Sequence, residues 1–313
     1  MGSTGTNGSK SRFEDKLIWG LVIAIAIGIV AFGAFYYLDR YAYSSPAPID
    51  REITQLEQMV VNDPDNANVR LAVADRYSAK KLYERAIQQY KEALKLNENL
   101  DRAWAGLGYA QLASSRNEDA IASFKRALDL VKSDKAGALS PGVAAVRYYL
   151  GAAYSNQGEL DKAIAEFRQV LEANRGDADA TYQLALVLQK KGMHDDAIGL
   201  FNYATDLVPD FKEAYSGLAE SYKAKGMATE EEYAEAMVDL FDQSYDQAIA
   251  RLQKVIAAKS DFANAYFGLG LALEKKGKLN EAKEAYSNAV KYKNNYASAQ
   301  AALARLNVAS PKQ

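Results

Sequence analysis

Two patterns in this sequence could support chemistry: a cluster of metal-binding side chains and a pair of glycine-rich segments. The only histidine, His194, is followed by Asp195 and Asp196. Imidazole and carboxylate groups can ligate a metal ion, but consecutive residues at a turn point in different directions, and no second ligand cluster is evident in the sequence. We therefore expect a solvated turn here and no metal site.

The segments AWAGLGYAQL (103–112) and YFGLGLALE (266–274) both contain Gly-x-Gly, which also occurs in loops that bind phosphate. A phosphate loop needs a strand before it and a helix after it, whereas these glycines lie inside stretches with a helical pattern. We predict no nucleotide site, so the recurrence of Gly-x-Gly requires another explanation.

The composition excludes several classes of function. The 313 residues include no cysteine, which rules out disulfides, thiolate metal sites and cysteine nucleophiles. The net charge is −2 and there is no long basic stripe, so nucleic acid has little electrostatic reason to bind. The Asp and Glu residues stand at helical surface spacing near Lys, which is typical of solvated faces and not of a catalytic pair. We predict a mostly helical protein that is not an enzyme and needs no cofactor.

Residues 17–38, LIWGLVIAIAIGIVAFGAFYYL, contain no charged side chain. As a helix of about 22 residues they would span about 33 Å, enough for the hydrocarbon core of a bilayer. The alternative is a buried core helix, but such a helix usually has one polar face and this one has none. We predict an uncleaved transmembrane helix between an N-terminal tail (1–16) and a linker (39–50).

The basic residues beside this segment favour one orientation. Lys10, Arg12 and Lys16 precede it, and only Arg40 and Arg51 follow it closely. Because positive charges favour the cytoplasmic side, we expect a single-pass protein of the cell membrane with a cytoplasmic N-terminus and the rest of the chain outside. The opposite orientation, with the rest in the cytoplasm, stays open.

The remainder of the chain repeats itself. Six segments each place an alanine first, a large apolar residue four positions later, and a small or β-branched residue three positions after that. The intervals from Ala86 to Ala120, from Ala163 to Ala197 and from Ala248 to Ala282 have the same length, and the other two intervals are longer. The segments are YERAIQQYKEAL (83–94), NEDAIASFKRAL (117–128), LDKAIAEFRQVL (160–171), HDDAIGLFNYAT (194–205), YDQAIARLQKVI (245–256) and LNEAKEAYSNAV (279–290).

This pattern, with its period of about 34 residues, resembles the tetratricopeptide repeat (TPR), a unit of two helices joined by a turn. Trp104, Leu107 and Gly108 match the first helix of that repeat. The resemblance implies an all-α, right-handed α-solenoid over residues 51–308, in which Gly108 and Gly270 let helices approach closely. Four further glycines fall where first helices should stop, a place that favours a left-handed residue: Gly158, Gly192, Gly226 and Gly277.

The predicted solenoid contains six units and a helix at each end. Residues 51–62 are expected to cap the N-terminal end and 297–307 the C-terminal end, because an internal unit exposes apolar surface on both sides. The units lie near 67–100, 101–134, 144–177, 178–211, 212–262 and 263–296.

The unit 212–262 is longer than the others and contains an inserted helix, predicted at 229–243. Thr229 and Glu232 match a capping box, and one face of the segment is apolar. The helix is either a spacer with solvated acids or a contact for a partner. The acids of its other face are Glu230, Glu231, Glu235, Asp239 and Asp242.

The resemblance further implies a concave groove lined by the first helices. The Lys, Asn and Arg clamp by which some members hold a terminal carboxylate is absent, since the corresponding positions include Leu71, Asp75 and Gly106. Aromatic residues in such a groove are suited to a peptide or a partner helix. The groove-facing positions by register are Leu71, Asp75, Tyr109, Tyr148, Tyr182, Leu186, Glu220, Phe267 and Leu271.

The predicted function is that of a membrane-anchored scaffold for protein–protein interaction, which resembles bacterial membrane-anchored TPR scaffold and assembly proteins. The short linker keeps the solenoid near the bilayer, so the expected partners are membrane-associated proteins. The alternative is a structural subunit of a larger membrane complex, formed by self-association or with other chains.

Overall fold

The computed structural model describes residues 48–131 and 140–309, which form fifteen α-helices and no strand. This confirms the prediction of an all-α solenoid. The chain divides into two units, residues 1–64 with helix α2 and residues 65–313 with helices α3 to α16.

Helix α2 extends over Pro48–Asn62. It begins before the predicted 51–62, so residues 48–50 belong to a helix and not to the linker. Its Ile53 is buried and its Met59 is half-exposed. Within 48–131 and 140–309, no helix has the length and apolar character needed to cross a bilayer. The predicted segment 17–38 lies outside the described residues, and so the anchor stays a prediction.

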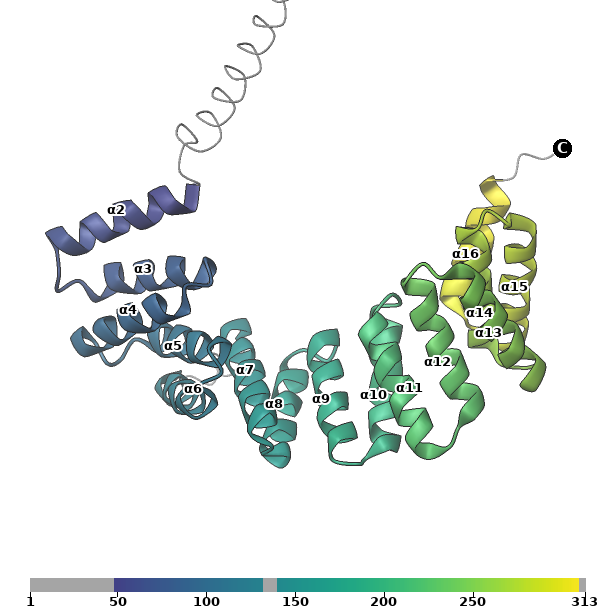
Figure 1. Cartoon of the computed structure of the whole chain (residues 1–313), viewed down its shortest axis with the longest axis horizontal. Coiled ribbons are helices and arrows are strands. Elements are labelled where there is room, and N and C mark those ends of the chain that lie inside the picture. Colours follow the sequence, from purple (N-terminus) through teal and green to yellow (C-terminus); the bar gives the residue numbers. More distant parts are fainter. Residues whose placement is uncertain (1–47, 132–139, 310–313) are drawn as a thin grey trace, which may run out of the picture. The chain divides into compact units, whose positions relative to one another are not determined.

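Helices α3 to α16 follow one another as antiparallel hairpins, each packed against the next (Figure 1). Helices α3, α5, α7, α9 and α11 also contact one another in succession, and α12 contacts α14. We call these seven helices the first-helix row. The bounds are α3 Ala67–Ala79, α4 Tyr83–Leu96, α5 Asp101–Ala113, α6 Asn117–Val131, α7 Pro141–Gln157, α8 Leu160–Ala173, α9 Ala178–Lys190, α10 His194–Leu207, α11 Lys212–Lys225, α12 Ala228–Phe241, α13 Tyr245–Ala258, α14 Ala263–Lys275, α15 Leu279–Tyr292 and α16 Ala297–Ala309.

The Gly-x-Gly segments lie where a first helix passes between two second helices. A Cβ atom on Gly108 would lie 2.7 Å from the ring of Phe124 on α6, and one on Gly106 would clash with the Tyr90 ring on α4. In α14 the same spacing recurs, with Gly270 against Tyr286 of α15. The two glycines therefore face opposite neighbours, and the recurrence reflects close packing of helices.

The turn inside each hairpin contains one residue with positive φ. The glycines predicted at these turns adopt it, with φ of 79° at Gly158 and 70° at Gly226. Lys81, Ser115 and Gln243 hold the equivalent place in other hairpins despite carrying a Cβ. Since Gly226 precedes α12 and Gln243 follows it, α12 is joined to both α11 and α13 by this type of turn. It thus follows α11 as a second helix and precedes α13 as a first helix.

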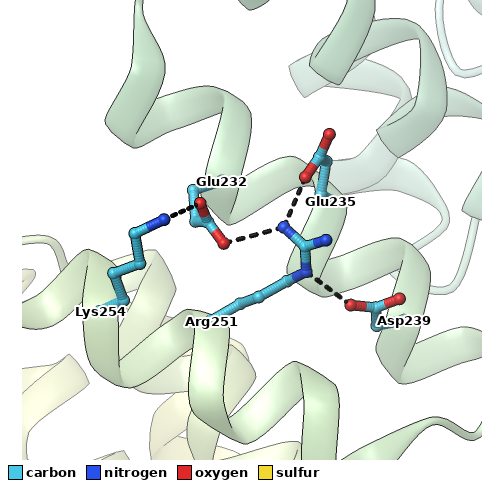
Figure 2. A network of polar contacts seen from close by, with 5 residues as sticks. All are labelled: Glu232, Glu235, Asp239, Arg251 and Lys254. Carbon is cyan, nitrogen blue, oxygen red and sulfur yellow. Dashed lines mark hydrogen bonds and ion pairs between the residues drawn. The ribbon is translucent and has the colours of Figure 1, made fainter.

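The acidic face of α12 is bound by basic side chains of neighbouring helices. Figure 2 shows Arg251 of α13 reaching three carboxylates of α12, at 2.8 Å from Glu232, 2.5 Å from Glu235 and 2.9 Å from Asp239. Lys254 adds a second contact to Glu232 at 2.5 Å and holds the pKa of that carboxyl below its usual range.

Two further pairs complete this arrangement, because Lys259 binds Glu230 and Lys212 binds Asp242. The predicted acidic surface is therefore mostly engaged within the solenoid. The capping box predicted at Thr229 and Glu232 is wrong. The helix begins at Ala228 with no side-chain cap, and the Glu232 carboxylate turns toward Arg251 because charge-assisted hydrogen bonds are stronger than a neutral one.

The Gly108→Ala substitution tests the close approach of α5 and α6. We expect it to lower the free energy of unfolding by roughly 1–3 kcal/mol, because the added methyl group overlaps the Phe124 ring. Gly199→Ala is the matched control: this glycine also lies inside a helix, but nothing lies within 4 Å of the added Cβ, so about 0.5–1 kcal/mol of stabilisation is expected. Urea unfolding followed by circular dichroism measures both, and equal effects would contradict this account.

Candidate functional site

Three tyrosine rings of the first-helix row form a connected group. The ring of Tyr109 on α5 lies 5.1 Å from that of Tyr149 on α7, and Tyr149 lies 5.5 Å from Tyr148, both in edge-on geometry. All three side chains are partly buried. Two residues predicted for the groove, Tyr109 and Tyr148, are thus linked by a third that the register did not single out.

Tyr148 on α7 and Tyr182 on α9 occupy the same place in successive units. Each ring rests on a buried phenylalanine of its own hairpin, Tyr148 on Phe167 at 5.6 Å and Tyr182 on Phe201 at 5.9 Å. The rest of each ring stays accessible, since both residues are only partly buried. Packing against the core therefore holds these rings in place at the surface.

Carboxylates at or within the next first helix influence both tyrosines electrostatically. Burial, together with the charges of Asp179 and Asp177, raises the pKa of Tyr148. The pKa of Tyr182 is raised by burial and by Glu213 and Glu220. Both hydroxyls therefore stay protonated and can donate hydrogen bonds at any physiological pH.

A cavity of about 630 Å³ opens beside the first of these clusters. Tyr148 and Tyr149 form one wall, and the start of α9 contributes Asp177 and Asp179. The Asp177 carboxylate also caps α9 by accepting a hydrogen bond of 2.9 Å from the backbone N–H of Ala180. The cavity thus combines aromatic surface with negative charge.

The first hairpin departs from the groove prediction. Leu71, at the position equivalent to Tyr148, is buried and offers no surface to a ligand, so that prediction is corrected. Asp75 accepts a hydrogen bond of 2.7 Å from the Tyr90 hydroxyl and pairs with Arg102 at 3.4 Å. Its carboxylate is therefore occupied by neighbours within the solenoid.

The remaining predicted groove residues differ in exposure. Glu220 is exposed, whereas Leu186 and Leu271 are partly buried. Phe267 is partly buried between the rings of Tyr286 and Tyr296, at 5.7 and 5.0 Å. Their role in binding stays a prediction.

A second cavity, of about 490 Å³, lies next to α12 and was not predicted from the sequence. Its aromatic lining includes Tyr215 of α11, Tyr233 of α12 and Tyr296, which precedes α16. The rings of Tyr215 and Tyr233 are 6.4 Å apart, and both residues are buried. Tyr233 lies within the helix predicted at 229–243, but Tyr296 is distant from it in the sequence, so no local pattern could predict that the two residues line one cavity.

The histidine cluster lies apart from both cavities. The expected solvated turn is confirmed for Asp195 and Asp196, which are exposed. It is wrong for His194, which begins α10 and is partly buried, with its Nδ1 shielded from solvent. Asp195 points to Lys225, 2.8 Å away. No group of three side chains suited to a metal ion occurs in the part of the chain that the structure covers.

The sequence also did not single out Asp179 and Glu213, although a signal was present. Their separation along the chain equals that between Tyr148 and Tyr182, so each acid follows its tyrosine at the same interval. The arrangement offers ring faces, hydroxyl donors and carboxylates on one row of helices. Such a surface can hold a ligand by contact and charge.

Family models described as tetratricopeptide repeat match this chain in several places. One matches residues 100–176, a second 148–210 and a third 263–303. A fourth, described as TPR repeat, matches 74–115 and 242–277. Together these matches extend over residues 74–210 and 242–303.

Individual relatives are distant. The chain is 27% identical over 209 residues to the mouse protein O-mannosyl-transferase TMTC3 and 24% identical over 184 residues to the TPR repeat-containing protein YpiA of Bacillus subtilis. These matches cover 66% and 58% of this chain, but only 18% and 41% of the relatives.

Two solved structures illustrate the fold. PilW, a type IV pilus biogenesis factor, is 20% identical with a TM-score of 0.54, and BtubC from P. vanneervenii is 17% identical with a TM-score of 0.51. Each match covers 68% of this chain, and 92% and 89% of PilW and BtubC respectively.

Because Tyr215 is buried, we expect the protein to lose folding stability at alkaline pH. Burial raises its pKa from 10.0 to about 12. Between these values the unfolded chain releases the phenolic proton and the folded chain retains it, so stability falls as pH rises, by about 1.4 kcal/mol per pH unit. Tyr215→Phe should make this fall shallower in urea unfolding above about pH 10.

The exposed Tyr203 provides the control, because Tyr203→Phe also removes a hydroxyl but outside the cavity. If the stability of Tyr215→Phe falls with pH as steeply as that of the parent protein, burial of the Tyr215 hydroxyl does not contribute to the alkaline loss of stability.

Proposed function

Since the chain belongs to the tetratricopeptide repeat family, we propose that it is a membrane-anchored scaffold that binds a partner protein along its first-helix row. Proteins of this family mediate protein–protein interaction or complex assembly. The observation that favours the first-helix row as the binding surface is the pair Tyr148 and Tyr182. Both rings are fixed by the core, partly exposed and placed on neighbouring helices.

Tyr148 and Tyr182 lower the entropic cost of binding a partner. A tyrosine offers a large contact area and loses little side-chain entropy when it is immobilised. Because Tyr148 and Tyr182 already rest on Phe167 and Phe201, most of that ordering is complete before a partner arrives. Pre-ordered aromatic anchors of this kind are typical of interface hot spots.

The anchor proposal is supported by the uncharged run 17–38, and it includes the orientation with the solenoid outside the cell. Tethering near the bilayer raises the effective concentration of the solenoid toward partners in the same membrane. The match to the O-mannosyl-transferase covers only 18% of that relative, so it gives no support for transferase activity in this chain.

Carbonate extraction tests the anchor. The full chain should stay in the membrane pellet at alkaline pH, because the uncharged run leaves the hydrocarbon core only at a large cost in free energy. A chain lacking residues 1–43 should appear in the supernatant. Release of the full chain by carbonate would refute the anchor. If the solenoid is protected from protease added outside intact cells, it lies in the cytoplasm and the proposed orientation is wrong.

The binding surface is tested by capture of partners from membranes with the full-length protein. Tyr148→Ala combined with Tyr182→Ala should weaken capture by about 2 kcal/mol or more, the scale of interface hot spots. The control combines Tyr203→Ala with Tyr292→Ala, which removes two exposed tyrosines from the second helices α10 and α15.

Thermal unfolding of the same variants separates binding from packing. Tyr148 and Tyr182 are only partly buried, whereas Phe167 is fully buried. Loss of the two tyrosine rings should therefore cost less stability than Phe167→Ala, for which roughly 3–5 kcal/mol is expected. Unchanged capture together with lowered stability would show that these tyrosines act in packing alone.

A further inference from the structure

We propose that α7, α9 and α11 hold two successive sites for basic side chains of an extended partner segment: Tyr148 with Asp179, and Tyr182 with Glu213. This inference rests on the scaffold function proposed above and specifies the chemistry of the partner. The sites are called the tyrosine–acid pairs below.

The pairs are two copies of one arrangement. In the first, the partly buried Tyr148 of α7 and Asp179, in the first turn of α9, line the same cavity. In the second, the partly buried Tyr182 of α9 and Glu213, in the first turn of α11, hold the same positions one repeat later. One repeat period separates the two tyrosines in the sequence, and the same period separates the two acids. Because α7 contacts α9 and α9 contacts α11, the two copies lie side by side along the row.

The acids of the two pairs differ from three first-turn acids of second helices. Asp161, Asp195 and Asp246, in the first turns of second helices, each pair with a lysine at the end of the following first helix: Lys191, Lys225 and Lys276. No such ion pair reaches Asp179 or Glu213 from any lysine or arginine within residues 48–131 and 140–309. The lining of the 630 Å³ cavity likewise includes Asp177 and Asp179 but no basic side chain of those residues.

This combination matches a cation on a flexible stem. A guanidinium or ammonium group is attracted both to the face of a tyrosine ring and to a carboxylate, and its methylene groups can cover apolar surface such as Ala144 and Ala145 in the cavity. An acidic partner would be repelled by these carboxylates, and a purely apolar one would leave them partly desolvated without a new partner. The surface therefore favours arginine or lysine.

The spacing of the pairs limits the partner sequence. Packed helices lie about 8–10 Å apart, and an extended segment rises about 3.3 Å per residue. Two basic side chains about three positions apart would thus reach Tyr148 and Tyr182 from one segment.

The series of pairs ends on both sides. One repeat period after Tyr182, Ser216 of α11 takes the place of the tyrosine. Further toward the C-terminus, Tyr233 is followed by Asn264 and Phe267 by Ser298, which are neutral. Toward the N-terminus, the position of the acid is held by Arg102, which binds Asp75. We therefore expect the basic part of the partner to be short, with neutral or apolar residues beyond it.

Peptide binding to the full chain, held in an uncharged detergent, tests the proposal. The probes are short synthetic peptides of neutral background with two arginines three positions apart, and the same peptides with citrulline or glutamate in place of arginine. Fluorescence anisotropy should show the arginine peptide binding more tightly than the citrulline peptide, by about tenfold for each site. The difference should shrink at high salt, since exposed charges are screened.

Asp179→Asn combined with Glu213→Gln should remove the preference for arginine over citrulline. The matched control is Asp161→Asn combined with Asp195→Asn, which makes the same change of net charge and also removes two first-turn acids, but on α8 and α10. The control should keep the preference. Charge reversal by Asp179→Lys with Glu213→Lys should shift it to the glutamate peptide, with circular dichroism verifying that the helices are intact.

Equal binding of the arginine and citrulline peptides, or an unchanged preference in the Asp179→Asn, Glu213→Gln variant, would overturn the proposal. If glutamate or citrulline peptides bind best and their binding depends on Tyr148 and Tyr182, the partner chemistry is wrong and the scaffold function stands. If no peptide binds and the Tyr148→Ala, Tyr182→Ala variant captures partners as well as the parent protein does, the scaffold function on this surface is wrong as well.

Discussion

The solenoid depends on how closely each first helix can approach the large side chains of the second helices beside it. Gly108, Gly151 and Gly270 face the rings of Phe124, Phe167 and Tyr286. Larger residues at these places would separate the helices and expose the rings. The close approach of α7 to α8 also fixes the position of Tyr148 at the surface, because its ring rests on Phe167. In other units alanine holds the same register position, as Ala74, Ala185 and Ala236, all fully buried.

Helix α12 shows how an irregular unit meets the same constraint. As a first helix for α13 it supplies Ala236 at the small-residue position. In the same register, however, Glu235 stands where Leu107 and Leu150 are buried in other units. A partly buried carboxylate is stable only with a partner, and Arg251 provides it while also binding Glu232 and Asp239. The acidic composition of α12 is thus explained by pairing within the solenoid.

The sequence predicted the parts of this structure that depend on periodicity. The regular spacing of alanines, the positive-φ glycines and the tyrosines at 148 and 182 all follow from the repeat, since each unit must present the same residues to its neighbours. Contacts that break the period were missed. Thr229 and Glu232 satisfied a local capping pattern, but Arg251 lies on another helix and competes for the carboxylate. The second cavity, where Tyr296 joins Tyr215 and Tyr233, depends on the path of the chain around α12.

The packing of each hairpin mainly on its neighbours has a mechanical consequence. Tension applied between two points of such a chain passes through the interfaces between those points and through no others. Tension between residue 65 and a partner bound to α7 to α11 would load the hairpins α3–α4 and α5–α6. Helices α12 to α16 would bear no load. The first two hairpins would then bear the load in series with the bound surface. Each could unfold and refold under tension before the helices that hold the partner are disturbed.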